Sequence, residues 1–329
     1  MTEQSLSDKS RTTCRIPPKI AMINDIAGYG RCSTTVSLPI ISSMGIQVCP
    51  VPTSLFSNHT GFPVHFMHDC TAILPDYLEK WRELGLSFDG IYCGFLGSVA
   101  QIDIVRDFLA SQRRNGAGSA CSTAMSPVVI LDPVMGDHGK AYRTVTSRHC
   151  SEMKELLSMA DIITPNITEA CLLTGAGYRD TGWSTEELTS LTEQLHAMGP
   201  AKIVITGMQE EGEFVNFISI KQKRAIATAT ATAIAVCTSP ENPGRAPEIS
   251  SPPLSLRMPS TASIFPVGGK AAGFVRTCTQ ASATLHIPRE QGVCFENFLY
   301  AHLSNDFIGS SPGDTPPAAD GRPAGTCEV

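Results

Sequence analysis

Residues 128–137 read Val-Val-Ile-Leu-Asp-Pro-Val-Met-Gly-Asp. Four consecutive apolar residues, without polar alternation, are typical of a strand that is buried on both faces of a parallel sheet. A proline then fixes the backbone where the chain leaves the strand, and two carboxylates, Asp132 and Asp137, lie on the following loop. Because ligands of open α/β sheets bind beyond the carboxyl ends of the strands, this stretch predicts both the fold class and the position of a site.

Short apolar runs of the same kind recur on both sides of this stretch. They are Ile20–Ile23, Val48–Val51, Gly90–Gly94, Ile162–Ile163 and Ile203–Thr206. Helical patterns lie between them, and the clearest runs from Ser184 to Met198 behind a Ser-x-x-Glu capping box. This alternation from Lys19 to Ile220 predicts an α/β fold with three layers, in which helices cover both faces of a mostly parallel sheet.

The alternation ends after Ile220. Ala-Thr repeats begin near residue 225, and a stretch rich in proline and serine follows as far as residue 266. We interpret 225–266 as a low-complexity segment without structure, because it buries too little apolar surface to offset the entropy lost on ordering. Helical patterns return at about 270–285 and 293–303. The expected organisation is a disordered N-terminus over 1–18, one domain over 19–303 interrupted by that segment, and a disordered tail over 304–329.

Composition excludes several classes of protein. The chain of 329 residues is 42% hydrophobic, enough for one large domain with a sizeable core, and its net charge of −6 argues against a nucleic-acid partner. The N-terminus lacks the apolar stretch of a secretory signal, and no run is long enough to span a membrane. The 12 cysteines are spread singly, without a Cys-x-x-Cys pair. This spacing indicates reduced thiols in a cytoplasmic protein, without membrane attachment.

Polar loops follow the first two predicted strands. The first strand ends in Asn24-Asp25, and a glycine-containing turn leads from there into a helix near Ser33. Taken alone, this turn is better explained as a plain strand-to-helix connection than as a ligand site. The second loop contains Ser57, His59 and Thr60 between apolar residues. It is either a surface turn or a polar loop that recognises a small heteroaromatic ligand.

A second group of polar residues follows the later strands. Asp132 and Asp137 either hold Mg²⁺ near nucleotide phosphates, directly or through water, or are solvated charges of a turn. Asn166 and Glu169 lie at the start of a helix, where a simple cap and the helix dipole would also explain them. Thr206 ends the next strand, followed by Gly207. We expect Asp132, Asp137, Asn166, Glu169, Thr206 and Gly207 to meet at one edge of the sheet.

The order of these motifs resembles the pyridoxal kinases, a branch of the ribokinase-like superfamily, which also includes hydroxymethylpyrimidine kinases. The resemblance covers roughly 19–220 and resumes near 270–303. It rests on five motifs, which are Asn24-Asp-Ile-Ala-Gly-Tyr-Gly-Arg-Cys-Ser, Ser57-Asn-His-Thr-Gly-Phe, Asp132-Pro-Val-Met-Gly-Asp, Thr164-Pro-Asn-x-x-Glu and Val204-Ile-Thr-Gly. The second and third of these are quite specific to the pyridoxal branch.

The resemblance implies a three-layer ribokinase-like fold, usually dimeric, and ATP-dependent phosphorylation of the hydroxymethyl group of pyridoxal or a related B6 vitamer. It implies that the substrate meets Asn24, Ser57, His59 and Thr60. It further implies that Asp132, Asp137 and Glu169 order Mg²⁺ and its waters around the ATP phosphates. Asn166, Thr206 and Gly207 would line the phosphate path. The implied partners are therefore a small-molecule substrate, ATP and Mg²⁺, within a homodimer.

The sequence departs from the family at one motif. The family carries Gly-x-Gly-Asp at the start of a helix, where the aspartate takes the substrate proton and backbone N–H groups stabilise the transferring phosphoryl group. Here the corresponding stretch reads Val267-Gly-Gly-Lys, and no acidic residue occurs between Glu248 and Glu290. The catalytic residue is therefore unknown, and we expect impaired turnover, since loss of a general base costs about 10²–10⁴ in rate.

Three alternatives follow from this departure. Another acid, such as Asp25, takes over as the base, or the chain is a pseudokinase that binds a vitamer or a partner without chemistry. In the third, a deletion or a misread splice junction has removed the motif from an intact enzyme. Independently of the missing motif, the alternative substrate is a hydroxymethylpyrimidine instead of a B6 vitamer.

Overall fold

The computed structural model describes most of the chain up to residue 237 and scattered positions beyond it. The described residues are 16–117, 126–210, 213–223, 228–237, 278, 282, 284–288, 291–293, 295, 296 and 299.

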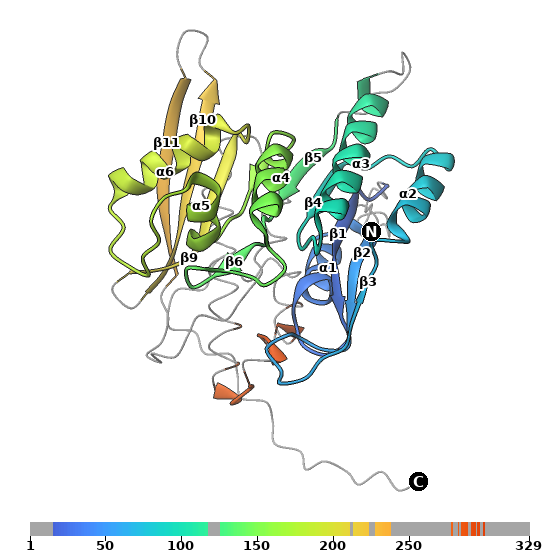
Figure 1. Ribbon diagram of the computed structural model, residues 1–329, viewed down its shortest axis with the longest axis horizontal. Coiled ribbons are helices and arrows are strands. Elements are labelled where there is room, and N and C mark those ends of the chain that lie inside the picture. Colours follow the sequence, from blue (N-terminus) through green and yellow to red (C-terminus); the bar gives the residue numbers. More distant parts are fainter. Residues whose placement is uncertain are drawn as a thin grey trace, which may run out of the picture.

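A nine-stranded sheet forms the centre of the fold, in the order β11-β10-β9-β8-β5-β4-β1-β2-β3 (Figure 1). Its strands are β1 (Lys19–Ala27), β2 (Gln47–Phe56), β3 (Met67–Asp69), β4 (Gly90–Cys93), β5 (Val128–Leu131), β8 (Ile162–Ile163), β9 (Lys202–Glu210), β10 (Glu213–Lys223) and β11 (Thr228–Cys237). The six central strands from β9 to β2 are parallel to one another. The outer pairs are antiparallel. All six predicted strands are confirmed, and so is the mostly parallel sheet.

Helices cover both faces of the sheet. They are α1 (Ser33–Ser43), α2 (Leu74–Glu83), α3 (Val99–Ala117), α4 (Ser147–Leu157), α5 (Ile167–Thr174) and α6 (Thr185–Ala197). The main core contains residues of α2 to α6 together with Ala21 and Ile23, whereas Ile20 and Met22 pack with Ile41 of α1. Because successive side chains of a strand point to opposite faces, α1 lies on the other side of the sheet from α2 to α6.

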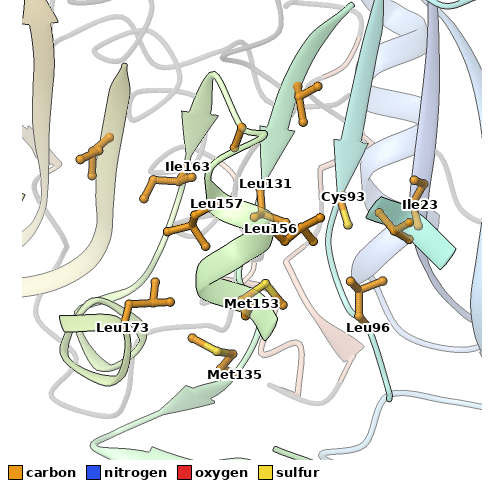
Figure 2. Packing of buried hydrophobic residues seen from close by; sticks show 14 of the residues in the cluster. Ile23, Cys93, Leu96, Leu131, Met135, Met153, Leu156, Leu157, Ile163 and Leu173 are labelled. Atoms are coloured by element: carbon orange, nitrogen blue, oxygen red, sulfur yellow. The ribbon is translucent and has the colours of Figure 1, made fainter. Parts of the chain in front are cut away.

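Parallel strands present a continuous apolar surface to α4. Ile23, Cys93, Leu131 and Ile163 come from four neighbouring strands and lie on the same side as Met153, Leu156 and Leu157 (Figure 2). Each of these seven side chains is at most 1% exposed. Burial of one such aliphatic side chain stabilises the fold by roughly 1.5–3 kcal/mol before entropy is subtracted, so this layer fixes the strands whose ends carry the polar loops.

The predicted start of α6 is confirmed. Ser184 Oγ accepts a hydrogen bond from the Glu187 amide at 3.2 Å, and the Glu187 carboxylate accepts one from the Ser184 amide at 2.8 Å. This reciprocal capping box satisfies two backbone donors that the first turn leaves without partners.

The low-complexity segment differs from our expectation over its first part. Thr228–Cys237 forms β11, which pairs antiparallel with β10 from Phe214↔Cys237 to Lys223↔Thr228. Threonine, isoleucine or valine occupies every second position of this strand. Such β-branched residues favour the extended conformation, and pairing with an existing sheet edge supplies the backbone partners. The predicted disorder of 1–15, 238–266 and 304–329 falls outside the described residues, as do most of the two late helices.

A segment near the C-terminus holds the loop after β1. The Arg31 amide donates to the Gln291 carbonyl at 3.0 Å, and Arg31 Nε lies 2.7 Å from Glu296 Oε1. Phe295 packs with Cys278 and with Ile40 of α1. Gly292 has a positive φ of +74°, and a Cβ added there would lie 2.5 Å from the Arg31 carbonyl oxygen.

We therefore expect Gly292→Ala to lower the free energy of unfolding by about 1–3 kcal/mol, because it combines left-handed strain with a backbone clash. Urea denaturation measures the change. Gly177→Ala is the matched control, since a Cβ at Gly177 meets nothing within 4 Å. Equal stability of the two variants would show that the contact between Gly292 and Arg31 does not contribute.

Candidate functional site

Asp132 begins the site at the carboxyl end of β5. Its side chain is buried, and Oδ2 accepts a hydrogen bond from Tyr92 Oη at 3.0 Å. Tyr92 lies on β4, the neighbouring strand, so the pair joins two strands of the sheet. Burial raises the pKa of Asp132 to about 7, although the hydrogen bond from Tyr92 favours the charged form. Sequence reasoning missed Tyr92, whose only signal was a hydroxyl inside an otherwise apolar strand.

Glu169 lies beside Asp132 in the first turn of α5. Its Oε2 accepts from the Asn166 amide at 2.8 Å, Asn166 Oδ1 accepts from the Glu169 amide at 2.9 Å, and Oε1 accepts from the Met135 amide at 3.1 Å. Burial and the charge of Asp132 raise the pKa of Glu169 well above its usual range. The capping role that the sequence suggested is confirmed, and the same carboxyl fastens the loop after Asp132.

Asn166 and Thr206 meet at the next two strands. Asn166 Nδ2 donates to the Gly136 carbonyl at 2.8 Å, and Asn166 forms an isolated parallel bridge with Thr206. Gly207 follows with a φ of +68°, and its amide lies 3.2 Å from Asn216 Oδ1. Asp132, Asn166, Glu169 and Thr206 are thus gathered at one edge of the sheet, as the sequence predicts.

Asp137 does not join Asp132 and Glu169 in a direct metal cluster. It lies in a short hairpin of β6 (Gly136–Asp137) and β7 (Lys140–Ala141), where its carboxylate accepts from the His138 amide at 2.8 Å. Within the part of the chain that the structure describes, no three acidic, histidine or cysteine residues are arranged to hold a metal ion. The prediction that Asp132, Asp137 and Glu169 order Mg²⁺ and its waters stays a prediction, because Glu169 is engaged in the capping box and Asp137 in its own hairpin.

Asn24 fastens the loops at the end of β1. Its Oδ1 accepts from the Phe95 amide at 2.9 Å and from the Asp25 amide at 3.0 Å, and the side chain is buried. A Cβ at Gly94 would lie 2.7 Å from the same oxygen. The sequence indicated Asn24 as a substrate contact, whereas the amide oxygen is used here to hold β1 against the loop after β4.

The 57–62 loop lies against the glycine turn after β1. The Tyr29 amide donates to the Ser57 carbonyl at 3.1 Å, and the His59 amide donates to the Tyr29 carbonyl at 2.9 Å. The Ser57 hydroxyl bonds Asn58 Oδ1 at 2.6 Å and accepts from the Phe66 amide at 2.8 Å, so it is engaged within its own turn. Thr60 is exposed.

The two groups of polar residues lie at the same edge of the sheet. Strands β5, β4, β1 and β2 are parallel neighbours, so Asp132, Asn24 and the 57–62 loop all follow carboxyl ends. Burial is the main reason for the raised pKa of Tyr92, and the charges of Asp132 and Asp25 raise it further. Tyr92 therefore stands between the acidic group and the first-strand loop.

Comparison with known proteins agrees with this geometry. A family model described as phosphomethylpyrimidine kinase matches residues 85–236. The pyridoxal kinase of Arabidopsis thaliana is 32% identical over 167 residues, which are 50% of each chain. The pyridoxal kinase PdxY of Leifsonia xyli is 28% identical over 198 residues, covering 58% of this chain and 64% of the relative. A putative phosphomethylpyrimidine kinase from Bacteroides thetaiotaomicron, in a crystal form with pyridoxal, has a TM-score of 0.71 at 29% identity and covers 87% and 96% of the two chains.

The chain is thus similar to pyridoxal kinases in sequence and in fold. It spans about half to two thirds of the length of the curated relatives that it matches. The pyridoxal kinase from Leishmania donovani, solved with ADP and ginkgotoxin, shares the fold at a TM-score of 0.72 and 20% identity, over 87% of this chain and 95% of that one. None of the helices that the structure describes has the length and apolar character needed to cross a membrane.

The raised pKa of Asp132 predicts that the stability of this protein depends on pH. In the unfolded chain the pKa of an aspartate is about 3.9, so folding favours its protonated form. That contribution is complete below about pH 4 and is lost as the pH rises through about 7. We expect Asp132→Asn to be more stable than the wild type at pH 8 by about 1–3 kcal/mol and to show a smaller loss between pH 5 and pH 8.

Urea unfolding in the presence of EDTA measures both quantities. Asp107→Asn, at an exposed position inside α3, is the control and should follow the wild type at every pH. If Asp132→Asn also followed the wild type, Asp132 would be charged in the folded protein at neutral pH.

Proposed function

We propose that this chain binds a B6 vitamer and ATP with Mg²⁺ at the carboxyl edge of its sheet and that its reaction is phosphorylation of the vitamer hydroxymethyl group. The observation that carries the proposal is the buried pair of Asp132 and Glu169, next to Asn166 and Thr206, at the same edge as the His59 loop. Relatives named pyridoxal kinases, and a similar structure obtained with pyridoxal, support the choice of substrate.

Aromatic residues support a flat ring as the substrate. Phe56 at the end of β2 and Phe95 after β4 have ring centroids 6.2 Å apart in an edge arrangement. His65 lies 6.0 Å from Phe56. Aromatic edges and faces of this kind favour stacking of a heteroaromatic ligand. The exposed Thr60 and the neighbouring His59 supply hydrogen-bonding groups for its substituents, as the resemblance implies.

The acidic pair fits a divalent cation near phosphates. Burial, and not a basic partner, dominates the pKa of both Asp132 and Glu169. Mg²⁺ in nucleotide sites commonly uses one or two carboxylates together with water and phosphate oxygens, so two acids are sufficient. A bound Mg²⁺ would neutralise charge that develops on the transferring phosphoryl group. Asp132 and Glu169 must lose their protons to hold it, which makes binding dependent on pH.

The residues of the site fall into a substrate-binding group and a phosphate-binding group. Asn24 and the 57–62 loop shape the substrate side, whereas Asn166, Thr206 and Gly207 line the phosphate path. Asp137 acts through water in this proposal, since it stands apart from the pair. No base is assigned, because residues 249–289 contain no acid and most of them fall outside the described residues. Reduced turnover is therefore part of the proposal.

A turnover and binding experiment tests this function. Pyridoxal, pyridoxine and a hydroxymethylpyrimidine are each offered with ATP and Mg²⁺, ADP release is followed, and binding is measured by calorimetry. We expect a vitamer to bind and kcat to lie at least 100-fold below the roughly 1–100 s⁻¹ of ordinary kinases. Asp132→Asn should weaken the Mg²⁺ dependence, and Asp76→Asn should not.

Each alternative has its own outcome. Ordinary turnover would show that another acid serves as the base. Vitamer binding without any ADP release would indicate a pseudokinase. A preference for the pyrimidine would identify a hydroxymethylpyrimidine, and not a B6 vitamer, as the substrate. Sequencing of the transcript across codons 220–270 identifies a faulty gene model if it restores Gly-x-Gly-Asp. Absence of binding to every one of these compounds would contradict the proposal.

We also propose a cytoplasmic homodimer. The thiols of five cysteines are free, namely Cys49, Cys70, Cys93, Cys150 and Cys171. The edge strand β3 and the preceding loop expose Val64 and Phe66, at 80% and 64% of their surface. Exposed apolar residues at a sheet edge are typical of an interface. Sedimentation of the full chain should give twice the mass of 35.1 kDa, and Phe66→Ser should favour the monomer. A monomeric wild type would contradict the dimer.

A further inference from the structure

Asp25 occupies an irregular position at the end of β1. In the pairing of β1 with β2, Asn24 faces Pro52 and Ile26 faces Leu55, so Asp25 lies opposite two residues of β2 and the extra residue belongs to β2. Such a bulge disrupts the strand pairing locally and is common beside active sites. The Asp25 amide is held by Asn24 Oδ1 at 3.0 Å, and the side chain is only 7% exposed. A carboxyl group is thus fixed inside the edge that carries the candidate site.

The surroundings of Asp25 come from three elements. The side chain of Ser33, the first residue of α1, hydrogen-bonds the carboxylate, and His59 acts on it from the facing loop. Ser33 has a positive φ of +49°. A left-handed conformation is unfavourable for a non-glycine residue, and residues in such strained conformations cluster at active sites and ligand clamps. In this strained conformation, the Ser33 hydroxyl reaches the Asp25 carboxylate.

Among the residues that the structure describes, no lysine or arginine acts on Asp25. Burial is the largest effect and raises its pKa. A buried carboxylate without a cationic partner destabilises a fold. Such groups are therefore usually paired with an opposite charge or have a role in binding or catalysis. The bulge at Asp25, the strain at Ser33 and the burial together indicate a carboxyl group whose partner is a ligand.

We propose that Asp25 determines specificity by accepting a hydrogen bond from the protonated ring nitrogen of a heteroaromatic ligand. This inference rests on the proposed function. Asn24, the preceding residue, bonds the Phe95 amide, and Phe95 faces Phe56, so Asp25 borders the aromatic residues assigned to the ring. A carboxylate and a ring N–H⁺ form a charge-assisted hydrogen bond, worth about 1.5–3 kcal/mol. That corresponds to a preference of roughly 10- to 100-fold.

The test compares two ligands that differ in one ring atom. These are pyridoxine and its benzene analogue, in which a C–H group replaces the ring nitrogen. Calorimetry gives the dissociation constants with the wild-type chain, with Asp25→Asn and with the exposed control Asp76→Asn. We expect the wild type and the control to prefer pyridoxine by 10- to 100-fold and Asp25→Asn to lose that preference. The ultraviolet spectrum of pyridoxine bound to the wild type at pH 8 should show the ring-protonated form.

The outcomes separate this inference from the function on which it rests. If the wild type binds neither compound, the proposed function fails, and the role of Asp25 fails with it. If the wild type binds both equally, or Asp25→Asn keeps the preference, only the role of Asp25 is overturned. Loss of turnover in Asp25→Asn with an unchanged preference would make Asp25 a base instead. If Asp25→Asn does not fold, Asp25→Ser and the wild-type spectrum decide, and an unprotonated bound ring overturns the inference.

Discussion

The burial of carboxyl groups at the end of a parallel sheet is the constraint on which the rest of the molecule depends. Asp132 and Glu169 are buried together, and the charge of the first raises the pKa of the second. The protein holds them through the hydroxyl of Tyr92 and through the capping box of α5, whose Glu169 also accepts a hydrogen bond from the Met135 amide in the loop after β5. Burial of these carboxyl groups is unfavourable for stability. The apolar layer beneath α4 offsets this by fixing the strands whose ends carry them.

Much of this architecture could be predicted from the sequence because its signals are local. The apolar run from Val128 to Leu131 and the capping box at Ser184 need no distant partner to be recognised. The alternation of strands and helices, together with the carboxyl-end rule, also predicted that Asp132, Asn166, Glu169 and Thr206 would meet. Strand β11 was missed because its backbone pairs with β10, and the Ala-Thr repeat gives no signal of that pairing.

The details of the site depended on long-range contacts that a sequence does not reveal. Asn24 is used by the Phe95 amide, 71 residues away, and Tyr92 gains its importance only because β4 lies beside β5. Arg31 is joined to Glu296 across 265 residues, so the loop after β1 is held by a segment near the other end of the chain. The family resemblance assigned substrate contacts by motif, whereas the structure shows which atoms of those residues are already engaged within the protein.

The account requires a vitamer ring and nucleotide phosphates to share one edge of the sheet, and a crystal structure of the complex tests this most directly. The chain would be crystallised with pyridoxine, Mg²⁺ and a non-hydrolysable ATP analogue. We predict the ring between the turn after β1 and the His59 loop, and the phosphates with their metal beside Asp132, Asn166 and Thr206. Ligands bound at any other face, with Asp132 and Glu169 still shielded from them, would contradict the assignment.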